Sequence, residues 1–169
     1  MSKKLRASDV EIQVARLFNY RVNLIVPNVS WGLNLRHECD LLIVTPARYA
    51  TEVEIKVTAS DIRADKRKHH DHNSTKIRRF FFAVPDYLAS CPDLPEDAGL
   101  ISVDSQNKSW HTKIVRRPRF NKTARPLTEA EYNKLAQLGC MRIWDLKEHI
   151  RLLKRERNHA VTKVADQTA

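Results

Sequence analysis

The sequence predicts one α/β domain in which helices flank a mixed β-sheet. Short apolar segments with the pattern of strands follow one another between residues 21 and 115. Segments with helical spacing of apolar residues lie before, between and after these strands, as in a sheet covered by helices. The chain has 169 residues, of which 42% are hydrophobic, and this is enough for one domain with a core and a modest appendage.

The first expected element is a helix over residues 8–18, in which Val10 and Val14 recur at helical spacing. Ser8 and Glu11 have the spacing of a capping box, so the helix is expected to begin at Ser8. This helix precedes the first strand of the sheet.

Three strands are expected next, and each has a different pattern. Residues 21–27 are a short apolar strand that Pro27 is expected to end. Residues 39–45 are almost continuously apolar, which predicts burial on both faces. After a turn at 46–49, residues 50–57 alternate between apolar and polar side chains.

A second helix is expected at residues 58–70, with Thr58 and Asp61 at capping-box spacing. Further strands are expected at 78–84, 99–103 and 109–115. Helices then follow: Thr128 and Glu131 predict a helix start, Gly139 predicts its end, and a last helix is expected at 141–157. The expected organisation is a core at 1–116, a basic linker at 117–127, a helical extension at 128–157 and a flexible tail at 158–169.

The positive charge is concentrated in the last third of the chain. The net charge is +10, and residues 1–104 carry 15 basic and 14 acidic side chains, against 15 and 6 in residues 105–169. A surface this unequal favours a polyanionic partner, above all nucleic acid, although charge alone fits any basic soluble protein.

Several other classes of protein are disfavoured. No apolar run approaches the ~20 residues that span a bilayer, and the first residues lack the apolar region of a signal peptide, so a soluble cytoplasmic protein is expected. Three widely spaced cysteines predict reduced thiols rather than a disulfide framework or a zinc knuckle. Neither a Walker A motif nor the pattern of a nucleophilic triad is present.

Two carboxylates and an ammonium share one face of the strand at 50–57. Glu52, Glu54 and Lys56 are two residues apart, and residues at this spacing project from the same side. If the two neighbouring strands form a hairpin, Asp40 at the start of one lies near Glu54 and Lys56 at the end of the other. Two carboxylates held within about 4 Å repel by roughly 4 kcal/mol at an effective dielectric near 20, so a cation between them is expected.

Two interpretations of this pattern stay open at the level of the residues. An alternation of Glu and Lys is an ordinary solvent-facing strand surface. An acidic residue such as Asp40 at the mouth of a buried strand, however, costs desolvation unless something satisfies it. Carboxylate ligands favour Mg²⁺, and Lys56 beside such an ion could orient a water or offset charge on a phosphate.

These residues resemble the signature of the PD-(D/E)xK nuclease superfamily. Asp40 is followed by Glu54-Ile55-Lys56 on the next strand, with a helix before and another after, and the order αβββαβ fits residues 8–84. The strings HECDLLIV, YATEVEIKVTASDIRADKRKHH, FFFAVP and LPEDAGLISV are similar to the phage-encoded and MmcB-like DNA-repair branch, over roughly residues 8–104. Cys39 stands where the name of the superfamily has proline.

The resemblance implies a restriction-endonuclease-like core with additional C-terminal helices. It also implies that Asp40, Glu54 and the backbone carbonyl of Ile55 bind Mg²⁺ or Mn²⁺, while Lys56 positions or activates the attacking water. Glu11 on the first helix matches an acidic residue that such proteins often place near the site, although its capping-box spacing gives it a structural explanation too.

Other residues are weaker candidates for the same site or for nucleic-acid contact. Glu52 shares the face of Glu54, and His37 could approach the site, whereas the histidines of residues 69–72 are less favoured as ligands. Trp31 and Tyr49 could touch nucleic acid, but packing or simple exposure explains them as well. The basic candidates for phosphate contact are Lys66, Arg67, Lys68, Arg78, Arg116, Arg117 and Arg119.

The function expected from the sequence is a Mg²⁺- or Mn²⁺-dependent DNA endonuclease, in DNA repair or phage DNA processing. One alternative is a non-catalytic nucleic-acid-binding protein that uses the basic C-terminal third. Another is an RNA-directed nuclease with the same site, because metal chemistry does not separate DNA from RNA. A homodimer is compatible with the sequence but is not required by it.

Overall fold

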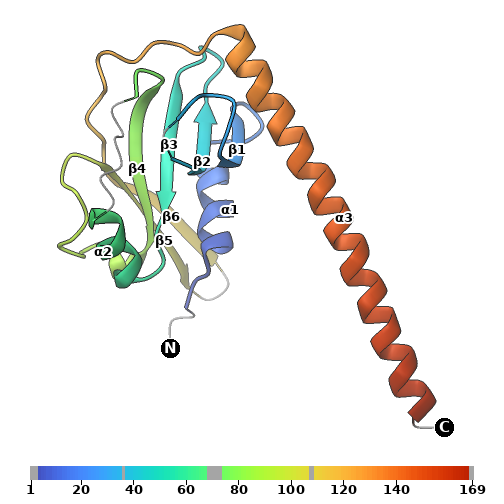
Figure 1. Cartoon of the computed structure of the whole chain (residues 1–169). Coiled ribbons are helices and arrows are strands. Elements are labelled where there is room, and N and C mark those ends of the chain that lie inside the picture. The colour runs from blue at the N-terminus through green and yellow to red at the C-terminus, as the bar shows by residue number, and fades with distance from the viewer. Residues whose placement is uncertain (1–3, 36, 68–73, 107–108, 168–169) are drawn as a thin grey trace.

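The computed structural model contains one six-stranded mixed sheet with helices on both faces (Figure 1). It describes residues 4–35, 37–67, 74–106 and 109–167. The elements in chain order are α1 (Ala7–Leu17), β1 (Leu24–Val29), β2 (Cys39–Val44), β3 (Ala50–Ile55), α2 (Ala59–Arg67), β4 (Ile77–Pro85), the short 3-10 helix η1 (Asp86–Leu88), β5 (Gly99–Gln106), β6 (Ser109–Arg116) and α3 (Glu129–Gln167). The order helix, three strands, helix, strand that the sequence predicts is therefore confirmed.

The strands lie side by side in the order in which they occur along the chain, from β1 to β6. β1, β2 and β3 form an antiparallel meander, β3 and β4 are parallel, β4 and β5 are parallel, and β6 returns antiparallel to β5. The connection between the parallel strands β3 and β4 passes through α2, as parallel pairing requires a crossover. This crossover places the end of β3 beside the start of α2.

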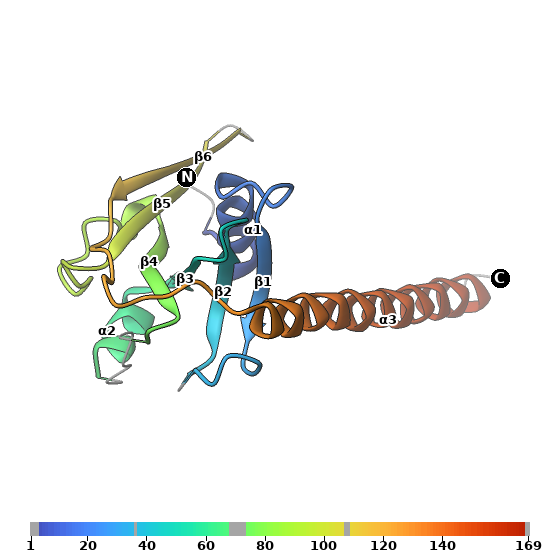
Figure 2. The same cartoon turned by 90° about the horizontal axis from the view of Figure 1, so that it is seen from above.

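The core has parts on both faces of the sheet. On one face, Val10 and Val14 of α1 pack against apolar side chains of β2 to β5. On the other face, Leu135 and Leu138 of α3 pack over β1 and β2, while Ile62 of α2 packs against β4 and β5. Figure 2 shows α1 and α2 on opposite sides of the sheet and α3 leaving its β1 edge.

Two expected boundaries in the first part of the chain are wrong. Pro27 lies inside β1 rather than at its end, because β1 is an edge strand and an edge tolerates a missing N–H donor. Ser8 lies within α1, whose N-cap is Arg6, and the Asp9 carboxylate accepts the Arg6 N–H at 3.0 Å. Glu11 is therefore not part of the cap of this helix.

The C-terminal helices, which the sequence predicts as two, are one continuous helix. The expected break at Gly139 does not occur, and α3 continues past residue 158, where a flexible tail was expected, to Gln167. Gly139 lies against β1, with the position of a Cβ atom 3.7 Å from Val26 Cγ2. Packing of this part of α3 onto the sheet offsets the roughly 1 kcal/mol that glycine costs inside a helix.

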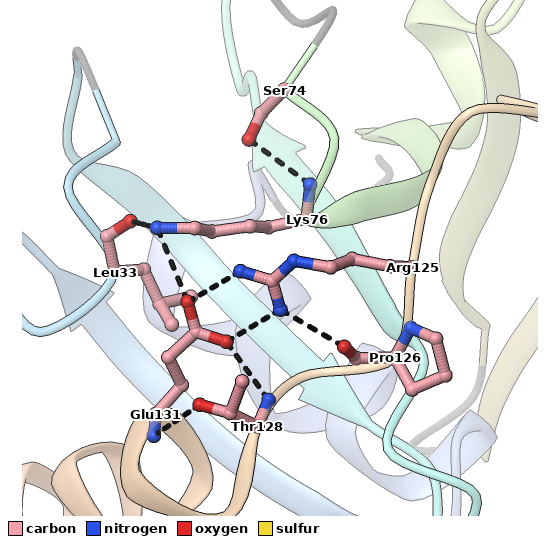
Figure 3. A network of polar contacts seen from close by, with 7 residues as sticks. All are labelled: Leu33, Ser74, Lys76, Arg125, Pro126, Thr128 and Glu131. Carbon is pink, nitrogen blue, oxygen red and sulfur yellow. Dashed lines mark hydrogen bonds and ion pairs between the residues drawn. The ribbon is translucent and has the colours of Figure 1, made fainter.

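A network around Glu131 fixes the start of α3 to the sheet (Figure 3). Thr128 and Glu131 form the expected capping box, with N–H to side-chain oxygen distances of 2.9 and 3.2 Å. Arg125 donates two hydrogen bonds to the Glu131 carboxylate at 2.7 and 2.8 Å, and Lys76 of the 74–76 turn lies 3.3 Å from it and also donates to the Leu33 carbonyl. These hydrogen bonds, led by the one from Arg125, hold the pKa of Glu131 well below its usual range.

We predict that Gly139→Ala raises the free energy of unfolding by about 0.5–1 kcal/mol, because alanine lowers the backbone entropy of the unfolded chain. The added methyl group would meet Val26 only at ordinary contact distance. Urea denaturation measures the change. Gly99→Ala is the matched contrast: its Cβ would lie 2.4 Å from the ring of the buried Phe81, so this variant should be destabilised by about 1–3 kcal/mol.

We predict that Glu131→Gln lowers the free energy of unfolding by about 1–3 kcal/mol at neutral pH, because it removes charge-assisted hydrogen bonds and half of a cap. Since the folded pKa is depressed, this contribution is present above the unfolded value near 4.5 and is lost as the pH falls below it. Glu148→Gln removes a similar double contact with Arg151 on the exposed part of α3 and should leave the melting temperature nearly unchanged. Equal effects of the two variants would contradict this account.

Candidate active site

The pairing of β2 with β3 brings Asp40 to the end of β3. Leu41 is paired with Val53, so Asp40 and Glu54 lie one step beyond this pair on neighbouring strands. The Asp40 carboxylate oxygen Oδ2 accepts the Ile55 N–H at 2.7 Å. The carboxylate that the sequence places at the mouth of β2 is therefore satisfied by the backbone of β3, directly beside Glu54.

Glu54 and Lys56 form a contact next to Asp40. The Lys56 ammonium donates to Glu54 Oε2 at 3.2 Å, and the side chains are only 14% and 8% exposed for Lys56 and Glu54 respectively. Their alternate positions at the end of β3 direct both to one side, as the sequence predicts. The two groups are held close together in a largely dehydrated setting.

The backbone around Ile55 is fixed on both sides. Its N–H is bonded to Asp40, and the N–H of Lys56 donates to the Ala83 carbonyl of β4 at 3.0 Å. In a trans peptide unit the C=O points opposite to the N–H, so the Ile55 carbonyl is directed away from β4 and toward the β2 side, where Asp40 lies. An Ile55 carbonyl with this direction could bind the same metal ion as the Asp40 carboxylate.

The carboxyl groups of the site repel one another. Burial first, and the charge of Asp40 second, raise the pKa of Glu54 to about 7, although the charge and the hydrogen bond of Lys56 act to lower it. Burial also raises the pKa of Glu11, as does the charge of Asp40. Glu11 of α1 thus lies within electrostatic reach of Asp40, which the helix spacing alone does not establish.

This donor set fits a hard divalent cation. Asp40 and Glu54 supply carboxylate oxygens on neighbouring strands, and the charge of Asp40 is second only to burial in raising the pKa of Glu54. Mg²⁺ and Mn²⁺ prefer such oxygen ligands, usually one or two carboxylates with water. A cation there would lower the pKa of Glu54 and remove the repulsion.

A second group of ligand-type side chains lies nearby, formed by His37, Cys39 and Glu52. Their ligand atoms all lie within 4.8 Å of one another, and among the described residues this is the one such trio of His, Cys, Asp or Glu. His37 Nε2 lies 2.5 Å from Glu52 Oε1 and 3.9 Å from Cys39 Sγ. The trio could hold a metal ion, and in the present arrangement His37 and Glu52 are hydrogen-bonded to each other.

The trio differs chemically from the carboxylate group. Burial, followed by the charges of Glu52 and Glu54, raises the pKa of the Cys39 thiol far above its usual value, so without a cation the sulfur is protonated. Thiol and imidazole ligands suit zinc and other transition metals rather than Mg²⁺. The sequence indicates His37 and Glu52 as weak candidates but does not indicate Cys39. Cys39 lies two residues after His37, at the spacing of side chains on one side of a strand, and β2 is paired with the strand that carries Glu52.

The predicted nucleic-acid contacts are spread over the fold. Arg78 stacks on Tyr49 at 3.9 Å, with Phe120 at 5.7 Å, and Arg79, which the sequence analysis omitted, lies 4.8 Å from Phe120. Arg116 donates to the Ala98 and Pro95 carbonyls at 2.8 and 2.5 Å. Arg78 and Arg116, which the sequence predicts to contact nucleic acid, thus both make contacts within the protein itself.

The remaining candidates are on the surface or lie beyond what the structure describes. Arg117 and Arg119 are exposed, as is Trp31 at 42%. Lys66 and Arg67 are the last residues of α2, while Lys68 and the histidine-rich residues 69–72 lie outside the described residues.

Comparison with known proteins gives a shared fold and no function. No protein-family model and no curated protein matches the chain. The structure is similar to that of SPO1766, a protein of unknown function from Silicibacter pomeroyi, with a TM-score of 0.61 and 20% sequence identity over 88% of this chain and 94% of that one. Within the described residues, no helix is both long enough and apolar enough to cross a membrane.

We predict that the stability of the protein without added metal depends on pH through Glu54. Its folded pKa lies above the unfolded value, so its contribution is fully present below pH 4.5 and is lost as the pH rises to about 7. Relative to Glu54→Gln, the wild-type protein should lose up to about 3 kcal/mol of unfolding free energy over this range. Urea denaturation in EDTA at several pH values tests this, and parallel pH profiles of the two proteins would contradict it.

Proposed function

We propose that the chain is a metal-dependent nuclease that hydrolyses phosphodiester bonds in DNA, with its active site at the ends of β2 and β3. The observation that carries the proposal is the hydrogen bond from the Ile55 N–H to Asp40, which holds Asp40 beside the Glu54–Lys56 pair. Two carboxylates, a lysine and a directed backbone carbonyl meet there, which is the set that the PD-(D/E)xK resemblance requires.

The connectivity of the sheet supports the same proposal. With α1 before them, the meander β1–β2–β3, the crossover through α2 and the parallel strand β4 follow the order αβββαβ, which supports the proposal of a restriction-endonuclease-like core. α1 packs on the sheet and carries Glu11 into the surroundings of Asp40. Under this proposal, Asp40, Glu54, Lys56 and Glu11 would form the catalytic site of such a core.

The residues have distinct proposed roles. Asp40, Glu54 and the Ile55 carbonyl would hold Mg²⁺ or Mn²⁺, with Glu11 close enough to act on the same charge. When bound, the cation would supply Lewis-acid chemistry, polarising a phosphate oxygen and making a coordinated water more acidic. Glu54 must be ionised to bind a cation, so its raised pKa makes cation affinity increase as the pH passes about 7.

The remaining catalytic role is proposed for Lys56. Its ammonium lies against Glu54, so it can orient the water that attacks phosphorus and offset the negative charge that develops on the phosphate. In the reaction the water oxygen forms a bond to phosphorus while the bond from phosphorus to the leaving sugar oxygen breaks. The partial burial of Lys56 strengthens its electrostatic effect relative to a lysine in open water.

We predict that the purified protein cleaves DNA in Mn²⁺ or Mg²⁺ and not in EDTA, and that Lys56→Ala lowers the rate by at least about 100-fold with little effect on DNA binding. Gel assays with labelled single- and double-stranded oligonucleotides measure cleavage, and fluorescence anisotropy measures binding. Lys113→Ala, which removes an exposed lysine of β6, is the matched control and should cleave as the wild type does.

Two outcomes would overturn the proposal. Cleavage that persists in EDTA or in Lys56→Ala would exclude this site as its source. Salt-dependent binding without cleavage in any divalent metal would instead favour the non-catalytic nucleic-acid-binding protein. An RNA oligonucleotide of the same sequence, tested in parallel, distinguishes a DNA nuclease from an RNA nuclease.

A further inference from the structure

The second half of α3 leaves the body of the protein. Leu135 and Leu138 are buried in the core beside β1, and Gly139 lies against Val26, but every residue from 143 to 159 is exposed. Figures 1 and 2 show this part of α3 extending away from the sheet and from the other helices. Packing against the rest of the protein therefore does not explain why this segment is helical.

The exposed segment carries a narrow apolar seam of Ile143, Leu146, Ile150 and Leu153. The spacings are three, four and three residues, so isoleucine occupies the a positions and leucine the d positions of two successive heptads. These four side chains are 55%, 58%, 42% and 51% exposed. Two further exposed apolar residues, Trp144 at 68% and Leu152 at 43%, occupy b and c positions and lie outside the seam. Apolar residues at a and d positions are the pattern of helix-to-helix pairing.

The seam has a polar border on both sides. Lys147 and Lys154 occupy the e positions, and His149 and Glu156 occupy the g positions. Polar residues at e and g are typical of the positions that flank a coiled-coil seam. A single helix of this kind is only marginally stable in water, and it also exposes a continuous apolar strip, so a partner helix on the seam would stabilise it.

We propose that the seam pairs with α3 of a second copy of this chain, which makes the protein a homodimer. Isoleucine at a with leucine at d is the combination that favours two-stranded coiled coils. A second copy brings an identical seam, and a two-fold axis lets identical seams cover each other. The inference is independent of the proposed nuclease activity, because no residue of the seam belongs to the candidate active site.

The dimension of the seam sets the expected strength of the dimer. Ile143 to Leu153 span about 15 Å of helix, so the buried area falls at or below about 1,200 Å², the low end for specific complexes. The next a position is Arg157, and a charged residue there weakens pairing. We therefore expect a reversible dimer with a dissociation constant on the order of micromolar rather than an obligate one.

The test is sedimentation equilibrium of the full-length protein at concentrations from about 1 to 200 µM, which bracket a micromolar dissociation constant. The wild-type protein should move from monomer to dimer over this range. Ile150→Glu, which buries two carboxylates in the seam of each dimer, should raise the dissociation constant at least about 30-fold. Circular dichroism of each variant checks that the helices are retained.

Leu152→Glu is the matched control, because Leu152 is adjacent, 43% exposed like Ile150 at 42%, and lies outside the seam. This variant should dimerise as the wild type does. A wild-type protein that stays monomeric at the highest concentration would overturn the inference. Equal loss of dimer in the two variants would overturn it as well, since the seam would then not be the contact.

Discussion

The candidate site depends on one hydrogen bond, from the backbone N–H of Ile55 to the carboxylate of Asp40. It exists because Leu41 pairs with Val53, which sets the register of β2 against β3. A slip of one residue would turn the side chains of β3 to the opposite face and separate Asp40 from Glu54. The apolar side chains that specify this register, on both faces of β2, are therefore also what positions the acidic groups.

The site concentrates negative charge inside a well-packed sheet. As a whole residue Glu54 is 6% exposed, and Glu52, two residues before it, is fully buried. Lys56 compensates part of this charge, yet the pKa of Glu54 stays raised to about 7. A fold that uses such residues only for stability gains little from them, since apolar side chains of similar volume would cost less to bury. The proposed cation would offset this cost by neutralising the buried carboxylates.

Much of the arrangement follows from sequence patterns, and the exceptions have physical causes. The alternation in β3, the apolar β2 and the Thr128–Glu131 cap could be read directly, because each is a local rule. The expected cap at Ser8 is wrong because α1 has Arg6 as its N-cap, with the Arg6 N–H donating to Asp9. The expected break at Gly139 is wrong because packing against Val26 is a tertiary contact. Cys39 lies close to His37 and Glu52 only because β2 pairs with β3, and the pattern of a single segment does not predict which strands pair.

The most direct measurement is anomalous diffraction from a crystal of the protein soaked in Mn²⁺ near pH 8, where Glu54 is ionised. The account predicts one strong anomalous peak between the carboxylates of Asp40 and Glu54, within ~2.5 Å of their oxygens and of the Ile55 carbonyl. A peak found only among His37, Cys39 and Glu52, or no peak at either group, would contradict it.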